Sequence, residues 1–238
     1  LMALVDKIVI NQFMTLADVG VYGIGVKIGM VIGLVISAFS MAYGPYAMSV
    51  KDDKESRFQY AKLFNIYLTT MLGIVLLIAF FDEKLVWMFT AGNPEFRDSE
   101  LVVAPIALSL VVHSFFSQLG VGLNLKKKNQ FFFYGAVFAL VINVVLNLLL
   151  VPVYGIVAAA WTNVVAYSFI CVWVYFINKR VFMIPYPLLE IGFKLICFTI
   201  AYAVICMYSS IIGLMVLFAF FVVAGFSIAP ANKYFFRL

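Results

Sequence analysis

A lysine lies inside one of the most apolar stretches of the chain. Lys27 falls in the run VYGIGVKIGMVIG, residues 21–33, about eight residues into its predicted helix. A charge at that depth is costly in lipid, and such side chains usually face a bundle interior or a water-filled cavity. The alternative is that Lys27 extends to the outer interface, which about 12 Å of helix would only just allow. Lys27 is therefore a candidate binding cation, with the interface left as an alternative.

Three further polar residues lie on the preceding apolar segment. Asp6 and Lys7 are about as far from the short turn TLAD, residues 15–18, as Lys27 is on its other side. An antiparallel hairpin would bring the charges of Asp6, Lys7 and Lys27 to one depth in the membrane, where they could form a paired cluster in a cavity. A purely structural ion pair is the alternative. Asn11 is one helical turn from Lys7 and would extend the cluster.

Later apolar segments carry a histidine and three asparagines. The only histidine, His113, is a candidate for protonation or sugar contact, although a lone intramembrane histidine more often bonds a neighbouring helix. Asn143, Asn147 and Asn163 flank the turn VPVYG, residues 151–155. Their amides would either join helices or contact sugar hydroxyls. No catalytic constellation and no metal-ligand spacing is present in the sequence, so neither a catalytic nor a metal site is expected.

These residues belong to a very apolar chain. Hydrophobic residues make up 66% of it and charged residues only 11%, which is typical of an integral membrane protein. The net charge is +5, but the Lys and Arg residues do not form the basic stripe that a nucleic-acid-binding protein needs, so a nucleic-acid partner is not expected. A chain in lipid must satisfy its own backbone hydrogen bonds, and the sequence lacks the alternating pattern of a membrane β-barrel, so an all-α fold is expected. About eight transmembrane helices are expected, near residues 1–14, 20–50, 59–81, 101–123, 131–151, 156–177, 192–208 and 211–229.

Lys and Arg residues divide unequally between the two sets of connections, once Lys7 and Lys27 are set aside. One set contains only Lys84 and Arg97, in the acidic loop 81–100. The positive-inside rule places the richer set in the cytoplasm, together with the C-terminus. Membrane lipid head groups are the expected contacts of this basic side. The richer set comprises Lys51, Lys54, Arg57, Lys62, Lys126, Lys127, Lys128, Lys179, Arg180, Lys194, Lys233 and Arg237.

Two stretches resemble polysaccharide-lipid flippases of the multidrug/oligosaccharidyl-lipid/polysaccharide exporter superfamily. Residues 6–49 are similar to the seventh and eighth helices of that family, with an intramembrane Asp, a loop ending near V-G-x-Y, a basic residue and then a Pro. Residues 120–167 resemble its basic loop, x-N-x-x-x-N helix, P-x-x-G turn and G-x-x-A-A-A run. The resemblance covers about residues 4–180. The matching residues are Asn143, Asn147, Pro152, Gly155, Ala158, Ala159 and Ala160.

The resemblance implies a V-shaped transporter of two six-helix lobes around a central cavity. Residues 1–180 would form the C-terminal lobe with its first helix truncated, and residues 181–238 an extra helix hairpin and a cytoplasmic tail. The N-terminal lobe would be missing, since the chain begins at Leu1 inside an apolar run. In related lipid II flippases a basic residue of the eighth helix faces the cavity, and Lys27 occupies a similar place.

The resemblance also implies a substrate and a location. An undecaprenyl-diphosphate-linked oligosaccharide, as in O-antigen and lipopolysaccharide biosynthesis, would be flipped across the bacterial cytoplasmic membrane by alternating access. No enzymatic step and no cofactor are implied, and Na⁺ or H⁺ is left open as a coupling ion. A cavity cation would offset the diphosphate charge, and amides would satisfy sugar hydroxyls. The candidate substrate-binding residues are therefore Lys27, Asp6, Lys7, Asn11, His113, Asn143 and Asn147.

Two alternative functions remain open from the sequence. A multidrug or cation antiporter of the same superfamily would use acidic groups for ion coupling. Only one acidic residue, Asp6, is clearly intramembrane, which weakens this alternative. A membrane oligosaccharide polymerase would need a sizeable outer loop with basic residues, whereas the loop 81–100 is short and acidic. A structural membrane subunit is less favoured, because apolar packing alone would not require Asp6 and Lys27.

Overall fold

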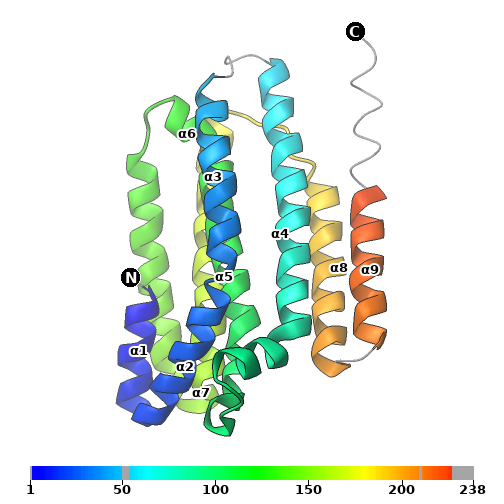
Figure 1. The fold of residues 1–238 in the computed structure, drawn as a ribbon. Coiled ribbons are helices and arrows are strands. Elements are labelled where there is room, and N and C mark those ends of the chain that lie inside the picture. The colour runs from blue at the N-terminus through cyan, green and yellow to red at the C-terminus, as the bar shows by residue number, and fades with distance from the viewer. Residues whose placement is uncertain (1, 50–53, 209–210, 227–238) are drawn as a thin grey trace.

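The computed structural model describes residues 2–49, 54–208 and 211–226, and these residues form helices without strands (Figure 1). The all-α prediction is therefore confirmed for this part of the chain. In order, the helices are α1 (Met2–Phe13), α2 (Leu16–Gly29), α3 (Ile32–Ser49), α4 (Lys54–Phe89), the 3₁₀ helix η1 (Pro94–Ser99), α5 (Glu100–Leu119), α6 (Val121–Leu125), α7 (Gln130–Val181), α8 (Leu188–Met207) and α9 (Ile211–Phe226).

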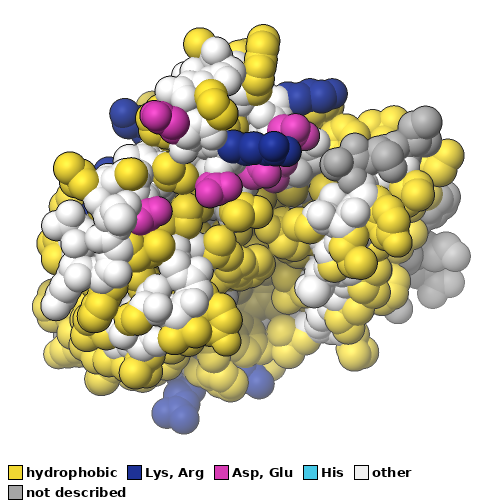
Figure 2. Space-filling model, turned by 90° about the horizontal axis from the view of Figure 1, so that it is seen from below, with side chains coloured by type: hydrophobic (Ala, Val, Ile, Leu, Met, Phe, Trp, Pro, Cys, Tyr) yellow, Lys and Arg dark blue, Asp and Glu magenta, His cyan; other side chains and the backbone are white. Residues whose placement is uncertain are grey.

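The connections alternate between the two ends of the bundle, as the charge pattern predicts (Figure 1). The basic end holds the end of α3, helix α6 and both termini of α7, with Lys126–Lys128, Lys179 and Arg180. The acidic end holds the α1–α2 turn, η1 and a bend in α7. Figure 2 views this end, where Asp and Glu side chains gather among hydrophobic ones. The predicted charges at Lys51, Lys233 and Arg237, and the predicted tail, lie outside the described residues.

Five described segments are long and apolar enough to cross a membrane. The longest, α7, is interrupted at Gly155, whose φ of 64° and ψ of −148° are accessible mainly to glycine. Its two arms therefore run antiparallel (Figure 1). These segments support a multi-pass membrane protein, but the expected count of eight helices is not confirmed, because α1 has 12 residues and the apolar part of α9 is short. The segments are Leu16–Ser49, Ser56–Phe89, Pro94–Leu119, Gln130–Val181 and Leu188–Met207.

Residues 20–49 belong to one apolar segment, as predicted, but the prediction that their helix is continuous is wrong. The helix is interrupted at Met30 and Val31. Here the backbone forms turn hydrogen bonds between residues three apart, such as that from the Val31 N–H to the Ile28 carbonyl at 3.1 Å. Pro45 lies within α3. Glycines at 29 and 33 flank the break, and glycine lowers helix stability by about 1 kcal/mol relative to alanine. Lys27 consequently lies in the last turn of α2 rather than in mid-helix.

The predicted loop over residues 81–100 is largely helical. Helix α4 continues to Phe89, well past the expected end at residue 81, because residues 85–89 are apolar and contain no helix breaker. The helix ends where Ala91 and Gly92 adopt positive φ values of 52° and 76°. Helix η1 then leads directly into α5.

Helix α5 forms the centre of the bundle, with residues 102–109 all buried. It packs against α2, α4 and α7. Two glycines permit the close approach of α2: a Cβ added at Gly25 would lie 2.8 Å from the Val102 Cβ, and one added at Gly29 would lie 2.8 Å from the Val103 carbonyl oxygen. Small residues of this kind allow membrane helices to pack closely.

The α8–α9 hairpin packs against α4 at one edge of the bundle (Figure 1). A polar contact lies in this interface. The Lys194 Nζ, on a side chain only 1% exposed, donates to the Asn65 Oδ1 at 2.7 Å, and the Asn65 Nδ2 donates to the Glu190 Oε2 at 3.0 Å. Asn65 thus bonds both members of an i, i+4 pair on α8, which attaches that helix to α4.

We expect Gly25→Val to destabilise the protein, because the added methyl groups would overlap Val102 and η1. Overpacking of this kind costs about 1–3 kcal/mol. Gly20→Val is a matched control on the same helix, since a Cβ there meets nothing within 4 Å. Thermal unfolding of the detergent-purified protein would measure both, and equal midpoints for the two variants would contradict the packing assignment.

Candidate functional site

A buried carboxylate is the most highly partnered polar group between α1, α2 and α7. Asp6 is 0% exposed. The Tyr22 hydroxyl donates to its Oδ2 at 2.7 Å, and the Asn163 Nδ2 donates to the same oxygen at 2.6 Å. The Asn147 Nδ2 donates to the Asp6 Oδ1 at 2.8 Å. Three donors from two neighbouring helices therefore replace water around this carboxylate.

Further polar side chains extend this arrangement within α7. The Thr162 hydroxyl donates to the Asn147 Oδ1 at 2.9 Å, and the Asn143 Nδ2 donates to the Asn163 Oδ1 at 3.2 Å. The Asn143 Oδ1 is buried and has no hydrogen-bond partner among the described residues. We call this set the Asp6 network; its members are Asp6, Tyr22, Asn143, Asn147, Thr162 and Asn163.

Two turns of the chain bring these groups to one level. Asn147 and Asn163 each lie eight residues from Gly155, so the bend in α7 places them opposite one another. The α1–α2 turn does the same for Asp6 and Tyr22. Thr15 caps α2 there in a capping box, with its backbone N–H donating to the Asp18 Oδ2 at 2.9 Å.

The predicted cluster of Asp6, Lys7 and Lys27 is not present. Lys7 is adjacent to Asp6 and therefore points about 100° away from it around the helix axis. Its Nζ lies 3.9 Å from the position of a Cβ built on Gly23. Lys27 is one turn beyond Gly23 on α2, is exposed, and makes no hydrogen bond or ion pair with the described residues. In the α1–α2 hairpin, the Asp6 carboxylate therefore points into the bundle, whereas Lys7 and Lys27 lie on a different face.

The other predicted residues lie apart from the Asp6 network, except for two asparagines. Asn143 and Asn147 are fully buried within it. Asn11 is exposed on α1. His113 is exposed on α5, where its ring centroid lies 4.5 Å from that of Tyr167 on α7.

Sequence analysis missed Tyr22 and Thr162 as members of the site, and treated Asn163 only as an amide beside the VPVYG turn. The signal was present in the spacing: Tyr22 and Asp6 lie at similar distances from Thr15, on opposite sides of the turn. Thr162 precedes Asn163 and faces Asn147 only because α7 folds back at Gly155.

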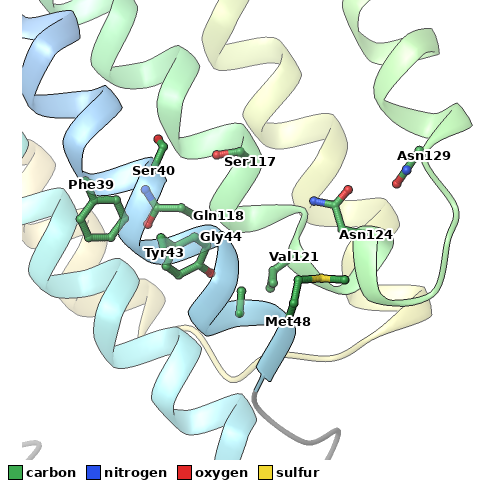
Figure 3. Close-up of a pocket in the computed structure, with 11 residues that line it drawn as sticks. Phe39, Ser40, Tyr43, Gly44, Met48, Ser117, Gln118, Val121, Asn124 and Asn129 are labelled. Atoms are coloured by element: carbon green, nitrogen blue, oxygen red, sulfur yellow. The ribbon is translucent and has the colours of Figure 1, made fainter.

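A second candidate site is a pocket of about 500 Å³ at the basic end, shown in Figure 3. It lies between α3, the end of α5, α6 and Asn129, which directly precedes α7. Figure 3 shows Gln118 of α5 extending toward Ser40 and Tyr43 of α3. Its polar lining residues are Ser40, Tyr43, Ser117, Gln118, Asn124 and Asn129.

Gln118 is the most deeply buried polar residue of this pocket, at 3% exposed. Its Oε1 is buried and has no hydrogen-bond partner among the described residues. None of the lining residues within the described part of the chain is charged. The Tyr43 ring stacks on that of Phe39, with centroids 5.5 Å apart, which gives the pocket an aromatic wall on α3.

Comparison of the chain with protein-family models, curated proteins and solved structures finds no match. Among the described residues, no three His, Cys, Asp or Glu side chains gather as metal ligands. The Asp6 network nevertheless presents carboxylate, amide and hydroxyl oxygens, the hard ligands that suit a small cation or a proton.

We expect Asn147→Leu to lower stability by about 2 kcal/mol, because the buried Asp6 carboxylate would lose a donor and Thr162 an acceptor. Asn178→Leu is a matched control. Asn178 is also a buried asparagine of α7, but its Oδ1 has no partner among the described residues.

Thermal or denaturant unfolding of both variants would test this expectation. A loss for Asn178→Leu as large as that for Asn147→Leu would show that shape, rather than the bond to Asp6, carries the effect.

Proposed function

We propose that the chain is the C-terminal lobe of an ion-coupled flippase for an undecaprenyl-diphosphate-linked oligosaccharide in a bacterial cytoplasmic membrane. The observation that carries this proposal is the Asp6 carboxylate, which is buried in an apolar bundle and pairs with no lysine or arginine among the described residues. Intramembrane carboxylates are costly, and they typically belong to ion or proton pathways.

The bonds around Asp6 suit a switch between two states. The carboxylate now accepts three hydrogen bonds. A bound proton or Na⁺ would compete with these donors, and rotation of the Asn147 amide by about 180° would present its oxygen in place of its nitrogen. Because the donors come from α2 and α7, ion binding would alter the contacts that hold α1 against both helices.

The two lysines of the α1–α2 hairpin supply the feature that favours an anionic substrate. Lys27 is exposed and Lys7 is half-buried beside the same stretch of α2. Their positive charges would stabilise a diphosphate in a cavity shielded from bulk water. The undecaprenyl chain would remain in the bilayer, while a second lobe would complete the cavity and permit alternating access.

The same geometry weighs against the alternative functions. A cationic drug would be repelled by Lys7 and Lys27, although the Asp6 network itself would serve an antiporter equally well. A polymerase is disfavoured because residues 81–89 belong to α4 and residues 94–99 to η1, which leaves little free loop between them. We therefore propose a transporter rather than an enzyme.

Asp6→Asn is expected to abolish ion-driven flipping, since the amide keeps the shape of the carboxylate but removes its charge. Flipping of the lipid-linked oligosaccharide would be measured in proteoliposomes of the complete gene product under imposed Na⁺ or H⁺ gradients. The gradient that drives the wild-type protein identifies the ion. Asp98→Asn, at an exposed site on η1, should behave as wild type. Gradient-dependent flipping by Asp6→Asn would refute the coupling role.

Lys27→Ala is expected to reduce flipping at least about tenfold without affecting membrane insertion, because the diphosphate loses a cation worth on the order of 1.4 kcal/mol. Lys27→Arg should retain activity. Lys84→Ala, which alters an exposed lysine at the acidic end, is the matched control. Export of the cognate polymer by cells, normalised to protein in the membrane, is the measurement. Normal export by Lys27→Ala would remove this residue from the site.

A further inference from the structure

We propose that the pocket at the basic end binds uncharged sugar units of the lipid-linked substrate. This inference rests on the proposed flippase function, but it concerns a different part of the molecule from the Asp6 network and the lysines of the α1–α2 hairpin. It assigns the polar head of the substrate to α3, α5 and α6, and it predicts that binding depends on the sugar rather than on the diphosphate alone.

The lining of the pocket matches the chemistry of sugar hydroxyls. Each hydroxyl of a sugar both donates and accepts a hydrogen bond, and so do the amide and hydroxyl groups of Gln118, Asn124 and Ser117. The Gln118 Oε1 has no partner among the described residues, and leaving such a buried oxygen unpaired costs about 1–3 kcal/mol. A ligand hydroxyl that reached this amide would offset that cost.

The pocket also has an aromatic surface, against which a sugar ring could pack. The Tyr43 and Phe39 rings stack on each other, with an interplanar angle of 19°. The C–H face of a sugar ring packs well against such aromatic surfaces. The volume of about 500 Å³ lies within the roughly 300–1,000 Å³ typical of small-molecule sites, so it would hold a ligand larger than a single ion.

The described lining residues indicate which part of the substrate enters. A phosphate or diphosphate is normally met by Arg, Lys or helix N–H groups, whereas none of the described residues that line this pocket is charged. Two cations lie close to the lining residues in the sequence. Lys127 and Lys128 are exposed and lie in the sequence between Asn124 and Asn129, two lining residues. The neutral sugar would therefore occupy the pocket, with the anionic groups left outside it.

Binding to the detergent-purified complete gene product would test this assignment. The probes are undecaprenyl diphosphate alone and a panel of undecaprenyl diphosphates that each bear one neutral hexose or N-acetylhexosamine. We expect the wild-type protein to bind at least one sugar-bearing lipid about tenfold more tightly than the bare lipid. Gln118→Leu should remove most of this difference, and Asn124→Ala should reduce it. Neither variant should change the affinity for the bare lipid.

Two comparisons keep this test independent of folding. Asn124 is exposed, so its truncation leaves the core intact even if Gln118→Leu proves unstable. Gln12→Leu, at an exposed site on α1, should keep the wild-type preference.

The outcomes separate the pocket from the flippase. Equal affinity of the wild-type protein for every lipid, or an unchanged preference in both pocket variants, would overturn the pocket assignment. A preference for sugar that Gln118→Leu abolishes, combined with no ion-driven flipping by the wild-type protein, would support the pocket and refute the proposed flippase.

Discussion

A single carboxylate in an apolar bundle constrains the arrangement of α1, α2 and α7. Asp6 cannot be solvated at its position, so its oxygens must be satisfied by protein donors. Tyr22 supplies one donor from α2, and Asn147 and Asn163 supply two from opposite arms of α7. If any of these helices moved away, a buried charge would lose a bond. The network thus holds α1 against α2 and α7, in addition to the apolar contacts of this region.

Close packing provides the second constraint, and it is concentrated on α5. Gly25 and Gly29 let α2 approach this helix, while α4 and α7 cover other sides of it. Beyond the break at Met30 the helix packs less closely. A Cβ added at Gly33 would meet nothing within 4 Å, and most of α3 is at least partly exposed. Helix α3 therefore leaves room beside α5, and the basic-end pocket lies in that room.

Hydropathy predicted the helical class, and the placement of Lys and Arg predicted the alternation of basic and acidic connections. The positions of Asp6, Asn143 and Asn147 within apolar segments were also recognised, and all three are buried. Hydropathy failed where the outcome depended on side-chain direction. Asp6 and Lys7 are sequence neighbours at nearly one depth, but they face different surroundings, so depth alone suggested an ion pair that does not form. The break at Met30 was missed because Pro45 was the more obvious breaker. The pocket around Gln118 was not foreseen, because its lining comes from three separate helices and the connection that precedes α7.

The bend at Gly155 fixes more than the direction of the chain. Asn147 and Asn163 donate to the same carboxylate from opposite arms of α7, so the number of residues between them is fixed by this geometry. One inserted residue would rotate an arm by about 100° and shift it by about 1.5 Å, which is enough to carry one amide away from Asp6. Substitutions on the lipid-facing sides of the two arms are therefore tolerable in a way that changes in their length are not.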